Sequence, residues 1–300
     1  MRTGHGPREF ALDPARYGLP TRDELVAMRI WDVHYHGLWE GDLRRHEETM
    51  FYVERMGIER VLSLDIAGTQ ADPLGRSVPA EARRAIRRLL EEHADRVSGL
   101  IPIDPGQPRE SCRKMEEWIR DGPCVGIKYY GGNPRGVTCS HPNNDPIIAL
   151  AAELKAIVYI HTWMKVGGDP RRPGGGNDAG ESTPIDVATL AERFPEVRFI
   201  CGHSGGDWEL GVRAVRPRPN VLIEFSGSDP HSGQVDYTVA QLGAERLVWG
   251  GHGPTRSYST ELSKVLDADL DEAQRRQIFG GNLRRIATPI FRRKGYPLEP

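Results

Sequence analysis

Short apolar runs alternate with longer segments of helical periodicity through most of the sequence. The runs that predict strands are residues 30–36, 60–64, 97–101, 125–128, 157–161, 197–203, 221–225 and 247–250. Between them, apolar residues recur at helical spacing against a face of Arg and Glu in residues 79–93, and similar patterns occupy 109–120 and 183–193. This order is typical of a parallel α/β sheet, which is either a closed (β/α)8 barrel or an open doubly wound sheet.

Two long Gly- and Pro-rich segments interrupt this pattern. Residues 131–146 and 166–184 follow the fourth and the fifth predicted strands. Loops of this length are usually functional or disordered, and barrel active sites lie at the carboxyl ends of the strands. Residues 1–29 form a Pro- and Arg-rich N-terminal arm, so we expect a single barrel domain over residues 30–300.

Charge and composition exclude several classes of partner. The formal net charge is −2, with 40 basic residues spread among 42 acidic ones, so we expect no nucleic-acid and no membrane partner. The sequence contains no signal-peptide pattern and no apolar run near the length of about 20 residues that a membrane span needs, which predicts a cytoplasmic protein. The four cysteines form no CxxC pair and are expected to be free thiols. A small-molecule substrate is the favoured partner, and both a monomer and a homo-oligomer are compatible with the sequence.

Histidines gather at the ends of three predicted strands. Strand alternation places His34 and His36 on one face, where two imidazoles can chelate one cation. His161 and His203 each end an apolar run in the same way. Singly, each is more often a hydrogen-bonded buried histidine than a ligand. Four at the same end of a barrel predict an imidazole cluster suited to Zn, Fe, Co or Ni.

In their order along the chain, these motifs resemble the amidohydrolase superfamily, specifically its amidohydrolase-2 branch of metal-dependent hydrolases and decarboxylases. The matching segments beside the histidines are Gly126-Ile127-Lys128, residues 195–199 (PEVRF), residues 245–250 (ERLVWG) and residues 278–285 (IFGGNLRR). The resemblance implies an amidohydrolase-like TIM barrel with its metal ligands at the carboxyl ends of the strands.

One position departs from this branch. Its members usually carry a metal-binding aspartate in a turn after the eighth strand, and here that position is His252. A bound imidazole is a poor base toward water on the same metal. Glu224 lies inside an apolar strand, where it is expected either to join the metal or to form a structural ion pair. Lys128 is a further candidate catalytic residue, either for substrate contact or for a salt link.

The loops and aromatic residues suggest what the substrate carries. Arg171 and Arg172 lie in the second long loop and are candidates for binding phosphate or carboxylate groups, although most such pairs are simply solvated. Trp163 follows the fifth predicted strand and is compatible with a bulky apolar substrate.

Three hypotheses follow for the function. The Asp-to-His change resembles TIM-barrel nonheme diiron monooxygenases of platensimycin-type diterpenoid antibiotic biosynthesis. It favours an enzyme with two iron ions that uses dioxygen and an external reductant to hydroxylate an apolar, terpenoid-like substrate, which a CoA thioester would carry. In this hypothesis the metal ligands are His34, His36, His161, His203, Glu224 and His252. The alternative is a zinc- or manganese-dependent hydrolase or decarboxylase of a small carboxylated compound. The third is a metal-free pseudoenzyme.

Overall fold

The computed structural model describes residues 18–38, 41–64, 66, 79–133, 135–164, 177–227 and 231–298. The candidate anion-binding residues Arg171 and Arg172 therefore lie outside the described residues, as does most of the N-terminal arm. Within the described ranges, none of the helices is long and apolar enough to cross a membrane.

Eight parallel strands form the centre of the molecule, in the order in which they occur in the chain. They are β1 (Ile30–Tyr35), β2 (Ile58–Ser63), β3 (Val97–Ile103), β4 (Gly126–Tyr129), β5 (Ile157–His161), β6 (Phe199–Gly202), β7 (Val221–Glu224) and β8 (Leu247–Val248). The end of β8 also approaches β1. The backbone N–H of Val33 in β1 donates to the carbonyl of Trp249, the residue after β8, at 3.3 Å. The prediction of a (β/α)8 barrel is thus confirmed.

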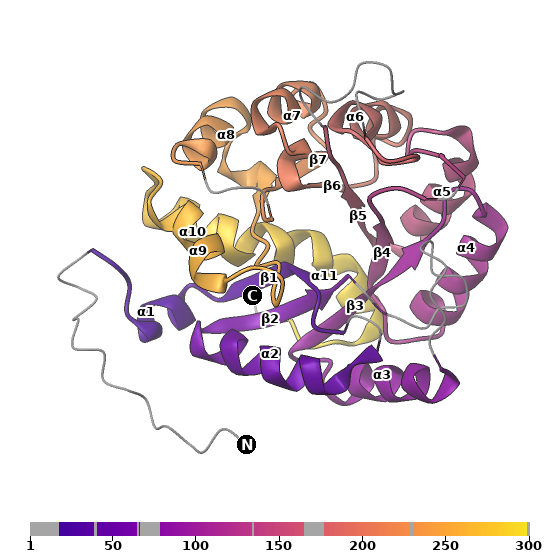
Figure 1. Cartoon of the computed structure of the whole chain (residues 1–300), viewed down its shortest axis with the longest axis horizontal. Coiled ribbons are helices and arrows are strands. Elements are labelled where there is room, and N and C mark those ends of the chain that lie inside the picture. The colour runs from indigo at the N-terminus through magenta and orange to yellow at the C-terminus, as the bar shows by residue number, and fades with distance from the viewer. Residues whose placement is uncertain are drawn as a thin grey trace.

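Helices surround these strands on the outside (Figure 1). They are α1 (Arg22–Ala27), α2 (Leu43–Arg55), α3 (Ala80–Glu92), α4 (Pro108–Met115), α5 (Asp145–Leu154), α6 (Pro184–Arg193), α7 (Trp208–Val215), α8 (Gln234–Leu242), α9 (Tyr258–Leu266), α10 (Glu272–Arg276) and α11 (Asn282–Lys294). Shorter turns are η3 (Glu116–Arg120) and η8 (Gln277–Gly281), which are π-helical, and η4 (Pro142–Asn144), η6 (His203–Gly205) and η7 (Ala244–Arg246). The three predicted helices correspond to α3, to α4 with η3, and to α6.

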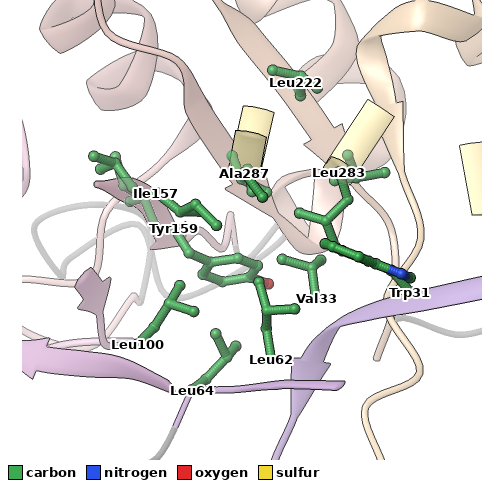
Figure 2. Close-up of a cluster of buried hydrophobic side chains, with 14 of the residues drawn as sticks. Trp31, Val33, Leu62, Leu64, Leu100, Ile157, Tyr159, Leu222, Leu283 and Ala287 are labelled. Atoms are coloured by element: carbon green, nitrogen blue, oxygen red, sulfur yellow. The ribbon is translucent and has the colours of Figure 1, made fainter. Parts of the chain in front are cut away.

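The interior of the barrel is filled by large apolar side chains, with one polar tip among them. Figure 2 shows the Tyr159 ring lying among Val33, Leu62 and Leu100. All four side chains are fully buried. Because burial removes their surface from water, these residues stabilise the barrel and leave the Tyr159 hydroxyl to find a partner inside it.

The helix α11 lies at the end of the barrel where the strands begin. Its Asn282 side chain donates to the carbonyl of Leu247 at 2.7 Å, and Arg284 donates to the carbonyl of Arg29 at 2.6 Å. Arg29 immediately precedes β1, and Leu247 is the first residue of β8. The opposite end, where the strands finish, is therefore the end left for a functional site.

Candidate metal centre

Three histidines from three different strands converge at the carboxyl end of the barrel. His34 lies on β1, His203 follows β6 and His252 follows β8. One ring nitrogen of each lies within 4.8 Å of the others, which makes them a group able to hold a metal ion. The ring centroids of His34 and His252 are 4.2 Å apart, and those of His34 and His203 are 4.8 Å apart.

Hydrogen bonds fix the same tautomer in all three rings. The Nδ1–H of His203 donates to the carbonyl of Ser226 at 2.6 Å. The Nδ1–H of His252 donates to the Thr255 hydroxyl, because that hydroxyl already gives its own proton to the His252 carbonyl at 2.8 Å. Three oxygens surround Nδ1 of His34: those of Tyr159 at 2.7 Å, Ser226 at 3.0 Å and Glu224 at 3.2 Å.

Each Nδ1 thus carries the proton and each Nε2 keeps its lone pair, which is the form of histidine that binds metals. The donor set therefore fits a metal ion. Three imidazoles in this tautomer can ligate a divalent ion through Nε2 and leave positions for other ligands.

Unusual backbone conformations bring two of these histidines into the group. His203 has φ of 62° and His252 has φ of 52°, in the left-handed region that residues other than glycine seldom adopt. Gly227 lies against both rings, since a Cβ there would come within 2.6 Å of the His252 ring and 2.9 Å of the His203 ring. Strain of this kind, about 1–3 kcal/mol at each residue, is typical of functional sites.

His36, His161 and Trp163 border the group of three. The His36 ring lies 4.7 Å from the rings of both His34 and His252. The His161 ring packs edge-on against His203 at 4.7 Å, and Trp163 contacts the same ring edge-on at 5.9 Å. These predicted site residues therefore lie in ring contact with the three-histidine group.

Glu224 lies beneath the imidazoles, fully buried. Its Oε2 accepts hydrogen bonds from the Tyr159 hydroxyl at 2.6 Å and from the backbone N–H of His203 at 3.1 Å. Its Oε1 accepts from the backbone N–H of Ser226 at 2.5 Å. Both carboxylate oxygens are thus engaged by protein donors, and the contact of Oε2 with Nδ1 of His34 lets Glu224 orient that ring.

Lys128 places a buried positive charge in the same region. Its Nζ lies 4.0 Å from the centroid of the Tyr159 ring. Burial is the main reason that the pKa of His34 and of His203 lies well below the ordinary value, and the charge of Lys128 lowers both further. Burial and Lys128 also lower the pKa of His161 to about 3.

His252 follows the same trend: burial, helped by His36 and His203, lowers its pKa to about 2. The imidazoles of His34, His161, His203 and His252 therefore stay neutral at neutral pH, as metal ligands must.

The sequence is described by the profile of a family named Amidohydrolase over residues 30–286. The chain belongs to the amidohydrolase family. Among curated proteins, none matches the sequence.

Several solved structures share this amidohydrolase fold at low sequence identity. 5-Carboxyvanillate decarboxylase from Sphingomonas paucimobilis is 14% identical, with a TM-score of 0.62 over 87% of this chain and 99% of its own. 2,6-Dihydroxybenzoate decarboxylase from Rhizobium is 18% identical, with a TM-score of 0.63 over 87% of this chain and 98% of its own. A dihydroxybenzoic acid decarboxylase from Polaromonas sp. JS666 is 17% identical, with a TM-score of 0.63 over 86% of this chain and 96% of its own. That structure contains bound manganese and the inhibitor 2-nitroresorcinol.

These findings correct the favoured functional hypothesis. The prediction of a nonheme diiron monooxygenase is wrong, because the similar amidohydrolases are metal-dependent decarboxylases of aromatic carboxylates and match the stated alternative. They support the coarser prediction of a metal-dependent enzyme, with manganese rather than iron in a similar structure. The error has a physical reason: imidazole binds zinc, iron and copper alike, so a histidine in place of an aspartate selects a metal only weakly.

The sequence interpretation missed several residues of the site. Tyr159, Ser226 and Thr255 hold the Nδ1 atoms, and Glu181 contacts His161, with its Oε1 3.3 Å from Nε2. Thr255 stands three residues after His252, a spacing that could have indicated a local hydrogen bond. The other three are brought to the site by the tertiary fold, and no sequence signal marked them.

Acidification should destabilise the metal-free protein. The lowered imidazole pKa values mean that below about pH 6.5 the unfolded chain binds protons that the folded site does not, so the free energy of unfolding falls as pH falls. The magnitude is about 1 kcal/mol per pH unit for each fully buried imidazole. Burial raises the pKa of Asp32 to about 7 and also raises that of Glu261, and both act in the opposite direction. They are two carboxyl groups against five imidazoles, because burial lowers the pKa of His46 to about 4 as well.

Urea unfolding at pH 7, 6, 5 and 4 measures this effect. A midpoint that stays constant or rises across this range would show that the folded site accepts protons after all. Saturating Mn²⁺ or Zn²⁺ should raise the midpoint at pH 7, because a ligand that binds only the folded state stabilises it.

Proposed function

We propose that this chain is a metal-dependent decarboxylase that removes CO₂ from a small aromatic carboxylate. Its structural neighbours include decarboxylases of 2,6-dihydroxybenzoate and 5-carboxyvanillate, which supports this substrate class. One neighbour holds manganese, so Mn²⁺ is the first metal to test and Zn²⁺ the second.

The observation that carries the proposal is the donor set itself. His34, His203 and His252 bring three neutral imidazoles together, and the third stands where members of the branch, hydrolases and decarboxylases alike, usually carry an aspartate. A metal-bound imidazole is a poor base toward water, so the change weakens hydrolysis most, whereas the loss of CO₂ needs a stabilised electron pair on the ring and a proton for the carbon. When bound, a divalent metal would act as a Lewis acid toward the substrate oxygens.

Two further residues would position an aromatic acid at this centre. The buried ammonium of Lys128 lies close enough to lower the pKa of four imidazoles and would attract a carboxylate or phenolate through a charge-assisted hydrogen bond. The indole of Trp163, in contact with the His203 ring, offers a flat apolar face on which an aromatic ring can pack.

A decarboxylation assay tests the proposal directly. Metal-free protein reconstituted with Mn²⁺ or Zn²⁺ is incubated with 2,6-dihydroxybenzoate, 5-carboxyvanillate and related hydroxybenzoates, and CO₂ release is measured. We expect metal-dependent turnover of at least one compound. The Lys128→Met variant should raise KM at least about tenfold by losing one charge-assisted contact of 1.5–3 kcal/mol, whereas Lys155→Met, at an exposed lysine, should not.

Two results would argue against this function. A metal-loaded protein that releases no CO₂ from any hydroxybenzoate, yet hydrolyses an ester, lactone or amide, would make it a hydrolase. A Lys128→Met variant with unchanged KM would remove this lysine from substrate binding.

A further inference from the structure

Helix α9 buries an ion pair next to the loop that follows β7. Oε2 of Glu261 lies 2.9 Å from Nζ of Lys264, and both side chains are 1% exposed. Moving two charges out of water costs free energy, and two apolar side chains of similar size are often as stable in their place. Stability alone is therefore a weak reason for burying this pair, and its other contacts indicate a role.

The ion pair binds the backbone on both sides of Ser226. Nζ of Lys264 donates to the carbonyl of Phe225 at 3.1 Å, and Oε1 of Glu261 accepts from the N–H of Gly227 at 3.3 Å. These two groups belong to the two peptide units that join Ser226 to its neighbours. Because each peptide unit is planar, fixing one of its polar groups also fixes the direction of the other. The ion pair therefore sets the orientation of both peptide units around Ser226.

The remaining polar groups of these two peptide units belong to the metal site. The carbonyl of Ser226, which shares a peptide unit with the Gly227 N–H, accepts from Nδ1 of His203 at 2.6 Å. The N–H of Ser226, which shares a unit with the Phe225 carbonyl, donates to Oε1 of Glu224 at 2.5 Å. The N–H and the C=O of a trans peptide point in opposite directions. The loop therefore turns one side of its backbone to the ion pair and the other side to the site.

The same loop also contacts the other two histidines. The Ser226 hydroxyl lies 3.0 Å from Nδ1 of His34, and its place depends on the backbone that carries it. Gly227 lies against the ring of His252, where a Cβ would come within 2.6 Å. A shift of this loop would therefore move contacts of all three imidazoles.

Helix α9 is itself fixed to the barrel. Its Leu262 and Val265 side chains are buried, and its Glu261 carbonyl accepts from the indole N–H of Trp249 at 3.0 Å. The helix begins at Tyr258, shortly after the turn that carries His252. It thus connects the turn after β8 with the loop after β7.

We infer that Glu261 and Lys264 are positioning residues of the metal centre, which act through Ser226 to hold the imidazoles of His34 and His203 in the geometry that binds a metal ion. The inference rests on the metal centre of the proposed function and adds the residues that keep this centre in place.

The double variant Glu261→Met/Lys264→Met tests the inference without any substrate. It removes both charges together, so neither is left buried without its partner. We expect the affinity of the full-length protein for Mn²⁺ to fall at least about tenfold in calorimetry, as is typical when a partner of a metal ligand is lost. In the NMR spectrum of the metal-free variant, the Nδ1–H signal of His203 should shift or broaden, because the Ser226 carbonyl is no longer held.

The ion pair of Arg29 and Glu59 provides the matched control. Its nitrogen and oxygen are 3.0 Å apart, it is partly buried, and it lies at the end of the barrel where β1 and β2 begin. Arg29→Met/Glu59→Met should leave both the Mn²⁺ affinity and the His203 signal unchanged. Equal losses of affinity in the two double variants would contradict the inference, since both would then reflect a general loosening of the fold. Thermal unfolding of the metal-free variants shows whether each is folded.

A folded Glu261→Met/Lys264→Met protein with an unchanged His203 signal and an Mn²⁺ affinity within about twofold of the wild type would overturn the inference. Should this variant not fold, hydrogen exchange in the metal-free wild type tests the same contact. The Gly227 N–H should exchange at least about a hundredfold more slowly than in an unfolded chain, and an unprotected N–H would reject its bond to Glu261. A failed decarboxylation assay of the wild type, with weakened Mn²⁺ binding in the double variant, would reject the proposed substrate class and support the positioning role.

Discussion

Replacing His34 by alanine is expected to abolish tight metal binding and to lower turnover by at least about a thousandfold. The His34 ring is in contact with the rings of His36, His203 and His252. Its loss removes one of three convergent Nε2 donors. A bound metal supplies several kcal/mol of transition-state stabilisation, and each 1.4 kcal/mol is worth a factor of ten in rate. Metal content after dialysis and the rate of CO₂ release measure the two effects.

His46 provides the matched control for this substitution. It is also a buried histidine, but it lies on α2, where its Nδ1 contacts the Tyr35 hydroxyl at 2.8 Å. His46→Ala should lower the free energy of unfolding and leave the metal content unchanged. If His34→Ala kept the full metal content, the metal would be bound elsewhere. If the wild type took up neither Mn²⁺ nor Zn²⁺, the hypothesis of a metal-free binding protein would take the place of the proposed enzyme.

The histidines at the strand ends are the part of the site that the sequence alone predicts. Alternation along residues 30–36 is enough to put His34 and His36 on one face, and apolar runs that end in histidine are enough to put His161 and His203 at the same mouth. These inferences need only local geometry and the rule that parallel strands finish at one end of a barrel. The histidines at the ends of β1, β5 and β6 were therefore predictable from local patterns, whereas the choice of a barrel over an open sheet and the place of His252 rested on the resemblance to the amidohydrolase-2 branch.

Contacts between distant segments were not predictable in this way. Glu224 was left open between metal and ion pair, and its partners come from the β5 side chain Tyr159 and from backbone N–H groups at His203 and Ser226. Glu181 lies in a polar, glycine-rich stretch without periodicity, and only the packing of two loops brings it to His161. Such pairings depend on tertiary structure, which a single sequence does not encode in any local pattern.

The helix α1 was not predicted, although the sequence contains a local signal for it. Residues 22–27 form α1 within the segment that was interpreted as an arm. Thr21 and Glu24 make a reciprocal capping box there, with the Glu24 carboxylate accepting from the Thr21 N–H at 2.7 Å. A threonine followed three residues later by a glutamate is a recognised helix-start signal. The signal was present in the sequence, and the Pro- and Arg-rich composition around it obscured it.

Glu224→Gln should weaken both the fold and the metal site. The carboxylate accepts from two backbone N–H groups and the Tyr159 hydroxyl, and an amide has one acceptor oxygen in place of two. At least one buried N–H is then left facing an NH₂ group, which costs about 1–3 kcal/mol for each unsatisfied donor. The free energy of unfolding of the metal-free protein, measured in urea, is expected to fall by about 2–4 kcal/mol.

Metal affinity should fall in the same variant because Glu224 also contacts Nδ1 of His34 at 3.2 Å. A carboxylate on the far nitrogen holds the ring in place and increases its basicity, and loss of such a partner typically costs 10–100-fold in metal affinity. Asp104→Asn separates the two effects. Asp104 is a buried carboxylate whose oxygens bind the Gly106 N–H at 2.8 Å and the Gln107 side chain at 2.9 Å, outside the imidazole cluster. That variant should lose stability and keep its affinity for Mn²⁺, and equal losses of affinity in both would assign Glu224 a purely structural role.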